Sequence, residues 1–322
     1  MNPLTGLYGA ATALRNTLFD RGVLSSRRLE RPVVSVGNLS LGGSGKTPFV
    51  IALGELLKAR GIRFDVLSRG YGRKTRGVLI VETDGNGADF GDEPLLIARR
   101  LGVPVIVGES RYAAGRVAER KFQPQLHVLD DGFQHRSLAR DFDIVLTTER
   151  DFDDRLLPSG RLREPLSSLR RADAIVLPRD FFVHDLSAAI KTFALRGKLI
   201  WQMNREIVVP AALVAPIVFC GIARPQQFFV QVRATGITPA AEVIFRDHHA
   251  YDRSDIERLL AMRGNLGAGG FLTTEKDAVN LASLQADLKP CAVAALSLTL
   301  DNPTEVVDAI LARTIFARII SQ

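Results

Sequence analysis

Short apolar runs rich in β-branched residues alternate with helical patterns along the N-terminal part of the chain. Alternation of this kind predicts a parallel sheet that is covered by helices on both faces. A helical pattern from Thr47 to about Arg60 follows the first apolar run. The predicted strands are Pro32–Val36, Phe64–Leu67, Val78–Val81, Val103–Val107, Leu126–Leu129, Ile144–Thr147 and Ala174–Leu177.

The pattern restarts at Ala215 and indicates a second, smaller α/β unit. Just before it, Trp201–Pro210 fits a hinge of extended strands. In the second unit Pro225 begins a helix, and Ser254 is the expected cap of another. The other predicted elements are the strands Ile217–Cys220, Val243–Phe245, Phe271–Thr273 and Ala294–Leu298, and the helices Asp255–Met262 and Pro303–Ala312.

Residues 4–24 carry apolar side chains at spacings of three and four, which is typical of one face of a helix. Four arginines follow between residues 21 and 31. Two interpretations stay open for this segment. The apolar face lies in a membrane interface with the arginines near lipid head groups, or it packs on the body of the protein.

A glycine-rich stretch lies between a predicted strand and a predicted helix and reads Ser40-Leu41-Gly42-Gly43-Ser44-Gly45-Lys46-Thr47. Glycines allow backbone N–H groups to turn around phosphate oxygens, and the helix N-terminus adds partial positive charge. Lys46 can reach the β- and γ-phosphates, and the Thr47 hydroxyl can ligate Mg²⁺. The usual pattern has glycine at the position of Ser40, but the strand–loop–helix context predicts a phosphate loop.

The phosphate loop and the strand pattern together predict the fold class. We expect an α/β fold with a P-loop NTPase-like, mostly parallel sheet, helices on both faces and a smaller C-terminal α/β unit. The expected parts are an N-terminal helix within residues 1–30, a core over 31–205 and a C-terminal unit over 206–322. A hinge is expected near residues 200–215.

Two adjacent carboxylates, Asp130 and Asp131, directly follow the predicted strand Leu126–Leu129. The carboxyl ends of parallel strands face the crevice where ligands bind, and acidic residues there hold Mg²⁺ in nucleotide hydrolases and kinases. The pattern therefore predicts a metal site without indicating which aspartate contacts the ion. His127 lies inside the strand and is expected in the core.

Several other charged residues are candidates for chemistry. Asp92 precedes a predicted helix and is locally typical of a helix cap, but a kinase also needs a carboxylate near its acceptor hydroxyl. In Asp247-His248-His249, a histidine bonded to a carboxylate is one possibility and an exposed histidine is another. Arginines cluster between residues 69 and 76 and between 155 and 171, where they bind phosphate or line solvated loops.

Composition narrows the function classes. Of the 322 residues, 42 are Lys or Arg and 35 are Asp or Glu, which gives a formal charge of +7. Hydrophobic residues make up 46% of the chain, and this share excludes a largely disordered protein. Two cysteines exclude a disulfide framework, and no apolar run is long enough to span a membrane. No nucleic-acid-binding motif and no obligate protein partner is indicated. We expect a cytoplasmic protein.

Taken together and in this order, the motifs resemble the tetraacyldisaccharide 4'-kinases of lipid A biosynthesis. The resemblance implies a P-loop core and a smaller C-terminal unit joined by extended strands, with the nucleotide between them. The matching stretches span residues 4 to 280 and include Pro32–Leu39, Ser68–Gly72, Gly91–Pro94, Asp130–His135, Gly160–Pro165, Phe245–His248 and Thr274–Asp277.

The resemblance also implies an activity. The γ-phosphate of ATP would be transferred, with Mg²⁺, to the 4'-hydroxyl of a tetraacyldisaccharide 1-phosphate lipid to give lipid IVA. The N-terminal helix would dock on the membrane, which would make the protein peripheral on the cytoplasmic face of the inner membrane. Asp92 would activate the hydroxyl with His248 as its partner, and Arg111 and Arg163 would stabilise charge on the phosphates. Whether Asp92 is the base or an orienting group stays open.

Two other functions are compatible with parts of the pattern. A P-loop NTPase that acts as a switch or a metal-insertion chaperone would share the phosphate loop and the two aspartates. A GTP-specific switch carries an Asn-Lys-x-Asp motif, and this chain lacks that spacing. A non-enzymatic peripheral membrane protein that binds nucleotide is the third possibility, and Asp92 and His248 outside the phosphate loop argue against it.

Overall fold

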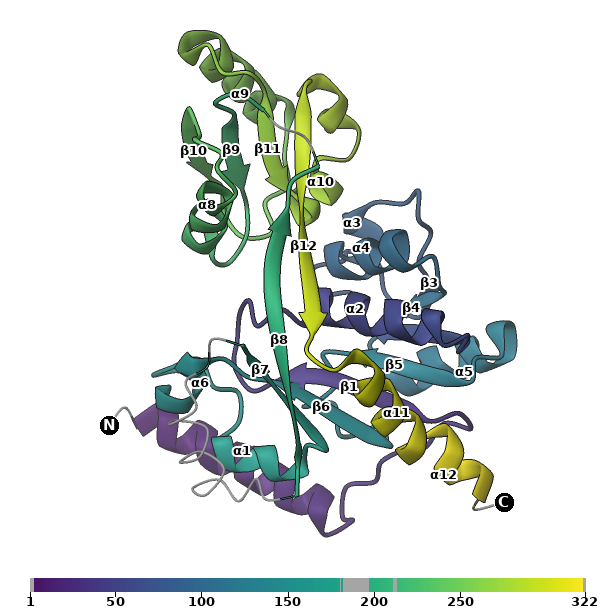
Figure 1. The fold of residues 1–322 in the computed structure, drawn as a ribbon. Helices are drawn as coiled ribbons and strands as arrows, with labels where there is room; N and C mark the ends of the chain where they lie inside the picture. The colour runs from purple at the N-terminus through teal and green to yellow at the C-terminus, as the bar shows by residue number, and fades with distance from the viewer. Residues whose placement is uncertain (1–2, 180, 182–196, 211–212, 321–322) are drawn as a thin grey trace.

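The computed structural model describes residues 3–179, 181, 197–210 and 213–320, which form two units joined by two long strands (Figure 1). The strands are β1 Val33–Asn38, β2 Phe64–Ser68, β3 Leu79–Ile80, β4 Val105–Val107, β5 Leu126–Asp130, β6 Phe142–Leu146, β7 Ala174–Pro178, β8 Leu199–Val208, β9 Ile217–Cys220, β10 Ala241–Ile244, β11 Phe271–Thr274 and β12 Cys291–Leu300. The helices are α1 Pro3–Asp20, α2 Lys46–Ala59, α3 Gly87–Phe90, α4 Asp92–Leu101, α5 Arg111–Phe122, α6 Glu149–Asp153, α8 Pro225–Ala234, α9 Arg253–Leu266, α10 Glu275–Leu281, α11 Pro303–Arg313 and α12 Ile315–Ile320, with 3-10 helices η1 Leu166–Arg171 and η2 Ala282–Asp287.

The described strands are hydrogen-bonded in the order β10-β9-β11-β12-β8-β7-β6-β1-β5-β2-β4-β3. Neighbouring strands are parallel except at two places, where β3 pairs with β4 and β12 pairs with β8 in antiparallel fashion. The mostly parallel sheet expected from the sequence is therefore confirmed. Its carboxyl edge carries the phosphate loop after β1 and the acidic pair at the end of β5.

Successive side chains of the central strands point to opposite faces of the sheet, and each face has its own helices. On β1, Val34 and Val36 pack in the large cluster that contains residues of α2, α4 and α11, whereas Val33 joins the cluster that contains Ala114 and Ala118 of α5. Because both faces are covered, these strands are mainly apolar runs in the sequence, with few polar interruptions.

The C-terminal unit repeats this arrangement on a smaller scale. Ile217 and Phe219 of β9 pack in the cluster that holds Ile256 of α9, while Val218 packs in the cluster that holds Phe229 of α8. The helix expected to begin at Pro225 is α8, with Pro225 in its first turn. The cap expected at Ser254 is wrong, because the Asp252 carboxylate accepts the N–H of Asp255 and the two residues form a capping box.

The end of the chain returns to the core. The expected C-terminal unit covered residues 206–322, but Val306, Val307 and Ile310 of α11 lie in the same buried cluster as β1 and α2. Apolar residues at this helical spacing pack where a sheet face is still open, and here that face belongs to the P-loop core. The smaller unit is thus inserted between β8 and β12.

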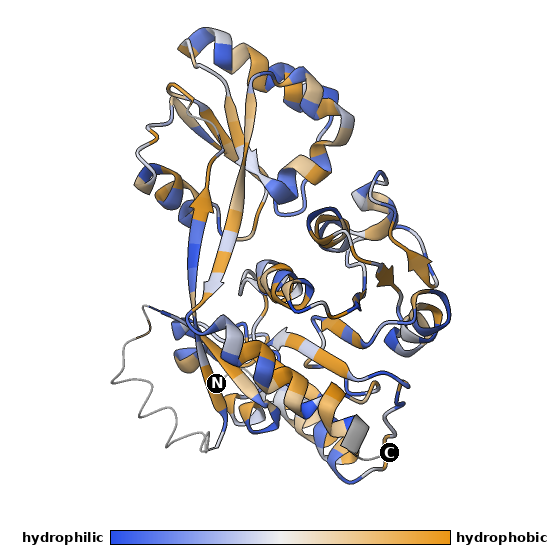
Figure 2. Cartoon of the chain, turned by 45° about the vertical axis from the view of Figure 1, so that its right-hand side comes forward, coloured by the Kyte–Doolittle hydropathy of each residue, from blue (hydrophilic) through white to orange (hydrophobic). Residues whose placement is uncertain are grey.

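The connection consists of β8 and β12, whose antiparallel pairing runs from Met203 opposite Leu300 to Val208 opposite Ala295. The stretch of β8 between the units is hydrophilic (Figure 2) and includes Asn204, Arg205 and Glu206. This location agrees with the extended segment expected around Trp201–Pro210. Residues 211 and 212 of the expected hinge lie outside the described residues.

At the N-terminus, α1 lies along the core and is attached mainly by polar contacts. The Tyr8 hydroxyl donates to the backbone oxygen of Arg163 at 3.0 Å, and Asn16 Nδ2 donates to Glu164 at 2.7 Å. The leucines Leu4, Leu7 and Leu14 are exposed. Within the described residues, no helix combines the length and apolarity that crossing a membrane requires.

A buried charge cluster lies at the opposite end of the strands from the phosphate loop. His127 on β5 is fully buried, as expected, and its Nδ1 lies 2.9 Å from Asp65 on β2, while its Nε2 lies 3.5 Å from Glu119 on α5. Burial alone would lower the pKa of His127, but the hydrogen bonds to both carboxylates outweigh burial and raise it to about 9.

This cluster predicts a pH-dependent contribution to stability. A histidine whose pKa is raised on folding stabilises the folded state fully below its unfolded pKa of about 6.5, and the effect is lost as pH rises through about 9. Replacing it by His127→Gln should therefore cost about 3 kcal/mol at pH 6, or roughly 5–10 °C in Tm. Thermal unfolding of both proteins between pH 6 and 9.5 should show the difference in Tm shrinking with rising pH. A difference that stays constant over this range would contradict the assignment.

Candidate active site

The phosphate loop turns between the end of β1 and the start of α2. Gly42 and Gly45 adopt left-handed φ values of 85°, which glycine tolerates far better than other residues. Ser40 is buried and does not have a positive φ, so this position does not require the glycine of the usual pattern. The strand–loop–helix geometry expected for Ser40–Thr47 is thus present, with Lys46 and Thr47 in the first turn of α2.

Asn38, the last residue of β1, organises the loop from within. Its Nδ2 donates to the Ser40 backbone oxygen and to Ser44 Oγ, both at 2.8 Å, and its Oδ1 accepts from Lys46 Nζ at 3.1 Å. Arg163 also donates to Asn38 Oδ1. One buried amide therefore fixes the loop and two cations, a role that the sequence analysis did not assign.

Two arginines reach the loop from elsewhere in the chain. Arg205 on β8 donates to the Ser44 backbone oxygen. A Cβ atom on Gly43 would lie 3.5 Å from Cδ of Arg224, which precedes α8. The loop is therefore in contact both with the connecting strand and with the smaller unit.

The two adjacent aspartates occupy opposite electrostatic environments. Asp131 forms a two-pronged pair with Arg163 at 2.9 and 3.0 Å and lies 3.5 Å from Lys46. Burial would raise the pKa of Asp131, but Lys46 and Arg163 outweigh it and lower it to about 2. Asp130 is buried and accepts from Ser68 Oγ at 2.9 Å, and its pKa is raised to about 7 by burial and then by Glu93 and Asp131.

Arg111, expected from the motif, is the first residue of α5 and is almost fully buried. Its Nη1 donates to the Glu109 backbone oxygen at 3.2 Å, while its buried Nε has no partner in the described structure. Burial and the charge of Arg69 lower the pKa of Arg111, and Asp130 and Asp131 oppose that effect. The Arg111 guanidinium is thus near enough to the acidic pair for their charges to interact.

Asp92 and His248 meet between the two units. Asp92 is the first residue of α4, whose cap position is Gly91, so the expected helix-cap role is wrong. His248 Nδ1 lies 2.9 Å from Asp92 Oδ2, and Asn280 on α10 donates to the same oxygen at 3.1 Å. Burial would raise the pKa of Asp92, but these two hydrogen bonds outweigh it and the pKa is lowered.

Glu93 connects this pair with the acidic pair. The charge of Glu93 helps to raise the pKa of Asp130. The pKa of His248 is raised mainly by its hydrogen bond with Asp92, and the charge of Glu93 adds to this effect. The end of β2 and the loop after it contact both groups, because Ser68 donates to Asp130 and the ring of Tyr71 lies 5.7 Å from that of His248, so the aspartates and the Asp92–His248 pair belong to one site. His249 lies apart from it, because its Nε2 lies 2.7 Å from Asp255 and its ring packs between Phe245 and Tyr251.

Two candidate residues have unusual backbone conformations. Asp131 has a φ of 49° and His248 a φ of 57°, in the left-handed region that side chains other than glycine seldom occupy. Strained backbone of this kind concentrates at functional sites, where neighbouring contacts hold it in place. At His248 one such contact is the hydrogen bond from its N–H to the Gly221 backbone oxygen at 3.2 Å.

Site residues that the sequence analysis missed are Asn38, Ser68, Glu93, Lys276 and Asn280. Three of them lie in motifs that the sequence shows, Asn38 in Pro32–Leu39, Ser68 in Ser68–Gly72 and Lys276 in Thr274–Asp277, so each had a signal in the sequence. Glu93 adjoins Asp92 but carried no separate pattern. Asn280 gave no sequence signal that would place it against Asp92.

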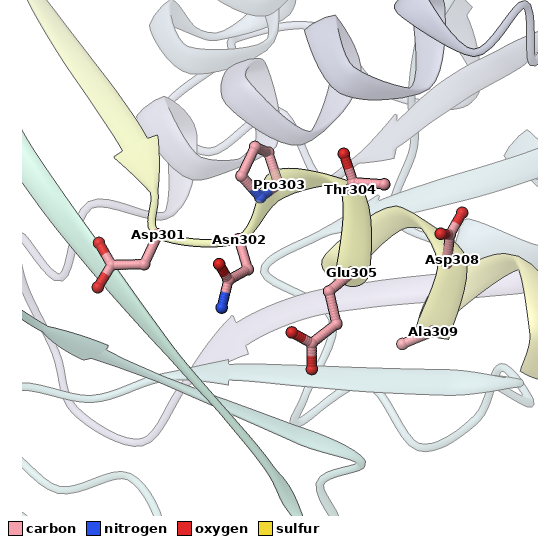
Figure 3. Close-up of a pocket in the computed structure, with 7 residues that line it drawn as sticks. All are labelled: Asp301, Asn302, Pro303, Thr304, Glu305, Asp308 and Ala309. Carbon is pink, nitrogen blue, oxygen red and sulfur yellow. The ribbon is translucent and has the colours of Figure 1, made fainter.

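A pocket of about 720 Å³ lies outside this site, at the start of α11 (Figure 3). Its lining includes the acidic residues Asp301, Glu305 and Asp308. Carboxylates repel phosphate, and none of the lining residues belongs to the phosphate loop or to the two acidic groups described above. The pocket is therefore not part of the candidate active site.

The donor set fits Mg²⁺ held together with a bound polyphosphate. Among the residues that the structure describes, no group of three or more His, Cys, Asp and Glu side chains forms a metal cage. Mg²⁺ is commonly held by one or two carboxylates, water and substrate phosphates instead. Asp130, with two acidic neighbours and a single hydroxyl donor, has the negative charge that such an ion neutralises, and Thr47 lies in the adjoining turn of α2.

Comparison with known proteins gives consistent results. The family model Tetraacyldisaccharide-1-P 4'-kinase matches residues 1–315. The tetraacyldisaccharide 4'-kinase of Koribacter versatilis is 49% identical over 321 residues, with 97% of this chain and 98% of the relative covered. That of Aquifex aeolicus is 42% identical over 294 residues, with 87% and 88% covered. A crystal structure described as the "apo" form of LpxK from Aquifex aeolicus in complex with ATP has a TM-score of 0.78 at 35% identity and covers 97% of this chain and 98% of that one.

The contrast between the two aspartates predicts opposite effects of the same substitution. Asp130→Asn removes a buried negative charge beside Glu93 and Asp131, so its Tm without divalent cations should rise by roughly 2–5 °C. Asp131→Asn breaks the pairs with Arg163 and Lys46, so its Tm should fall by a similar amount, roughly 2–5 °C. Added Mg²⁺ should raise the Tm of the wild type more than that of Asp130→Asn. Two aspartate variants with the same sign of change would contradict this distinction.

Proposed function

The chain belongs to the tetraacyldisaccharide-1-P 4'-kinase family, the ATP-dependent kinases of lipid A biosynthesis, and we propose that Asp92 and His248 activate the acceptor hydroxyl beside the phosphate loop. The substrate is the lipid disaccharide 1-phosphate, and the phosphate donor is ATP. The observation that carries the residue assignment is the 2.9 Å contact of His248 Nδ1 with Asp92.

The phosphates of ATP are bound by the loop Ser40–Thr47. Its backbone N–H groups and the start of α2 supply positive electrostatic potential, and Lys46 supplies a full charge. Arg163 and Arg111 lie on two sides of the acidic pair and balance charge on the transferring phosphoryl group. Phosphoryl transfer depends on positioning and charge neutralisation more than on covalent chemistry, which suits this set of residues.

Mg²⁺, when bound, would neutralise negative charge on the phosphates. The residues proposed to hold it are Asp130 and Thr47. Asp131 acts differently, because its carboxylate is already neutralised by Arg163 and Lys46 and keeps those two cations in place.

Asp92 is arranged to accept a proton at one defined oxygen. Its Oδ2 already receives hydrogen bonds from His248 and Asn280, which leaves Oδ1 for the proton of the 4'-hydroxyl. Because the pKa of Asp92 is lowered, the carboxylate is ionised at neutral pH and ready to accept it. His248 and Asn280 come from the smaller unit, so this geometry depends on the arrangement of the two units.

We further propose that α1 docks on the cytoplasmic face of the inner membrane. Polar side chains of the helix face the protein, while Leu4, Leu7 and Leu14 face outward, the reverse of an ordinary surface helix. An outward apolar row with basic residues after it suits the interface of an anionic membrane. The helix contacts Arg163 and Glu164, so docking through α1 would bring the lipid surface next to the segment that carries Arg163.

The activity is tested by transfer of labelled γ-phosphate from ATP to a tetraacyldisaccharide 1-phosphate in detergent micelles, with and without Mg²⁺. The wild type should give a Mg²⁺-dependent bis-phosphorylated lipid. In Asp92→Asn, kcat should fall by roughly 10²–10⁴-fold with ATP affinity unchanged, because the base is lost while the phosphate loop is intact. His249→Gln serves as the matched control and should retain most of the activity.

Two outcomes would contradict this assignment. Loss of ATP binding in Asp92→Asn would make Asp92 a structural residue of the nucleotide site. ATP hydrolysis by the wild type without labelled lipid would instead indicate an NTPase whose product is not the phosphorylated disaccharide.

The membrane proposal predicts a loss of binding from the apolar row of α1. The triple variant Leu4→Ser, Leu7→Ser, Leu14→Ser should sediment at least about fivefold less with 3:1 phosphatidylethanolamine–phosphatidylglycerol vesicles, since each exposed leucine contributes about 1 kcal/mol or more when buried in lipid. A matched control is Leu260→Ser with Leu266→Ser, two exposed leucines on α9. Equal vesicle binding by the two variants would refute docking through α1.

A further inference from the structure

We propose that Lys276 is a positioning residue that holds His248 as a neutral imidazole with its proton on Nδ1, so that the ring donates to Asp92. The inference rests on the proposed function of the Asp92–His248 pair and adds a third member from α10. Lys276 Nζ lies 3.1 Å from His248 Nε2 and 3.1 Å from Asp247 Oδ1. Its side chain is largely buried at 19% exposure.

The protonation state follows from which groups are able to donate. A lysine ammonium has three N–H donors and no acceptor, so the ring nitrogen that it meets has to be an unprotonated acceptor. His248 Nε2 is that nitrogen. The ring proton is then on Nδ1, which lies 2.9 Å from the acceptor Asp92 Oδ2. The two hydrogen bonds together exclude the opposite tautomer.

The charges around His248 come from several elements. Asp92 and Glu93 of α4 and Asp247 of its own loop favour the imidazolium form, whereas Lys276 of α10 opposes it. The ring of Tyr71, from the loop after β2, lies 5.7 Å from the imidazole and is tilted by 57°. The hydrogen bond with Asp92 has the largest effect and the pKa of His248 is raised on balance, so Lys276 is the cation that limits this rise.

The charge of the His248 ring affects how well Asp92 can act as the base. An imidazolium would neutralise Asp92 and weaken it as a proton acceptor, whereas a neutral Nδ1–H orients the carboxylate and leaves its charge in place. The second donor to Oδ2 is Asn280, one turn after Lys276 on α10. Residues of one helix therefore support both hydrogen bonds to Oδ2, which leaves Oδ1 of Asp92 as the proposed proton acceptor.

The start of α10 is held firmly enough to perform this role. Asp277 is fully buried and accepts from the Gly221 N–H at 2.8 Å, from the Tyr251 hydroxyl at 2.8 Å and from Thr274 Oγ1 at 2.6 Å. The Gly221 backbone oxygen in turn accepts from the N–H of His248. The Thr274–Asp277 motif thus anchors Lys276 and the His248 loop to the same point at the end of β9.

The direct test is the ¹⁵N NMR signature of the His248 ring in the full-length protein, assigned by its loss in His248→Gln. At pH 7.5 the wild type should show a protonated Nδ1 and an unprotonated Nε2. In Lys276→Met the ring should stay protonated on both nitrogens up to a higher pH than in the wild type, because the opposing positive charge is gone. A wild-type ring with a protonated Nε2 would overturn the proposal.

Kinetics give a second readout that a purely structural role would not produce. In Lys276→Met, kcat should fall by about 10- to 100-fold with the KM for ATP unchanged, and the acid limb of the kcat–pH profile should move to higher pH. Lys276→Arg keeps a charged donor and should restore most of the rate and the acid limb. A uniform loss of kcat with no movement of the acid limb would reduce Lys276 to a packing role.

Lys289→Met is the matched control. Lys289 is exposed and lies just before β12. The first residue of β12 pairs with the first residue of β11, whereas α10 follows the last residue of β11, so Lys289 lies at the other end of these strands from α10. This variant should change neither the NMR signature nor the pH profile. The NMR experiment requires no lipid phosphorylation, so failure of the kinase assay with an intact Nδ1–H tautomer would affect the proposed function and leave the Lys276 assignment standing.

Discussion

The hydrogen bond between Asp92 and His248 is the contact on which the proposed active site depends, because its partners are 156 residues apart and come from different units. The two units are linked by β8 and β12, and the stretch of β8 between the units, which includes Asn204, Arg205 and Glu206, is hydrophilic (Figure 2). The 2.9 Å contact therefore depends on the relative position of the units. The neighbouring contact of Asn280 with the same oxygen makes that position more specific.

The carboxyl edge of the core sheet imposes a second constraint, which is an accumulation of buried charge. Asp130, Asp131 and Glu93 are gathered at one edge with Lys46, Arg111 and Arg163, and burial makes any imbalance costly. The negative charges of the two aspartates are balanced to different extents. Asp131 is matched by two cations, whereas Asp130 has one hydroxyl donor. This asymmetry separates the roles of two residues that are adjacent and identical in the sequence.

The sequence predicted the fold best for strands that are covered by helices on both faces. The strands β1, β5, β6 and β7 are mainly apolar runs, and their existence and parallel pairing were confirmed. The prediction was less accurate for α11. Its apolar residues have an ordinary amphipathic spacing, which predicts a helix but does not indicate which part of the sheet the helix covers. In the site, Lys46 and the aspartates lie in local motifs, whereas Glu93 and Asn280 act across 37 and 188 residues, which no local pattern encodes.

The same reasoning explains why the polarity of α1 was ambiguous. Helical spacing indicates an apolar face but not what it contacts, and both interpretations of residues 4–24 were open. The structure buries Asn16 against Glu164 and exposes Leu7, so the polar face is the one that packs on the protein. Burying a polar face is tolerable when its groups are hydrogen-bonded, and Asn16 and Tyr8 are. The apolar row is thereby left facing outward, directly above the segment that carries Arg163.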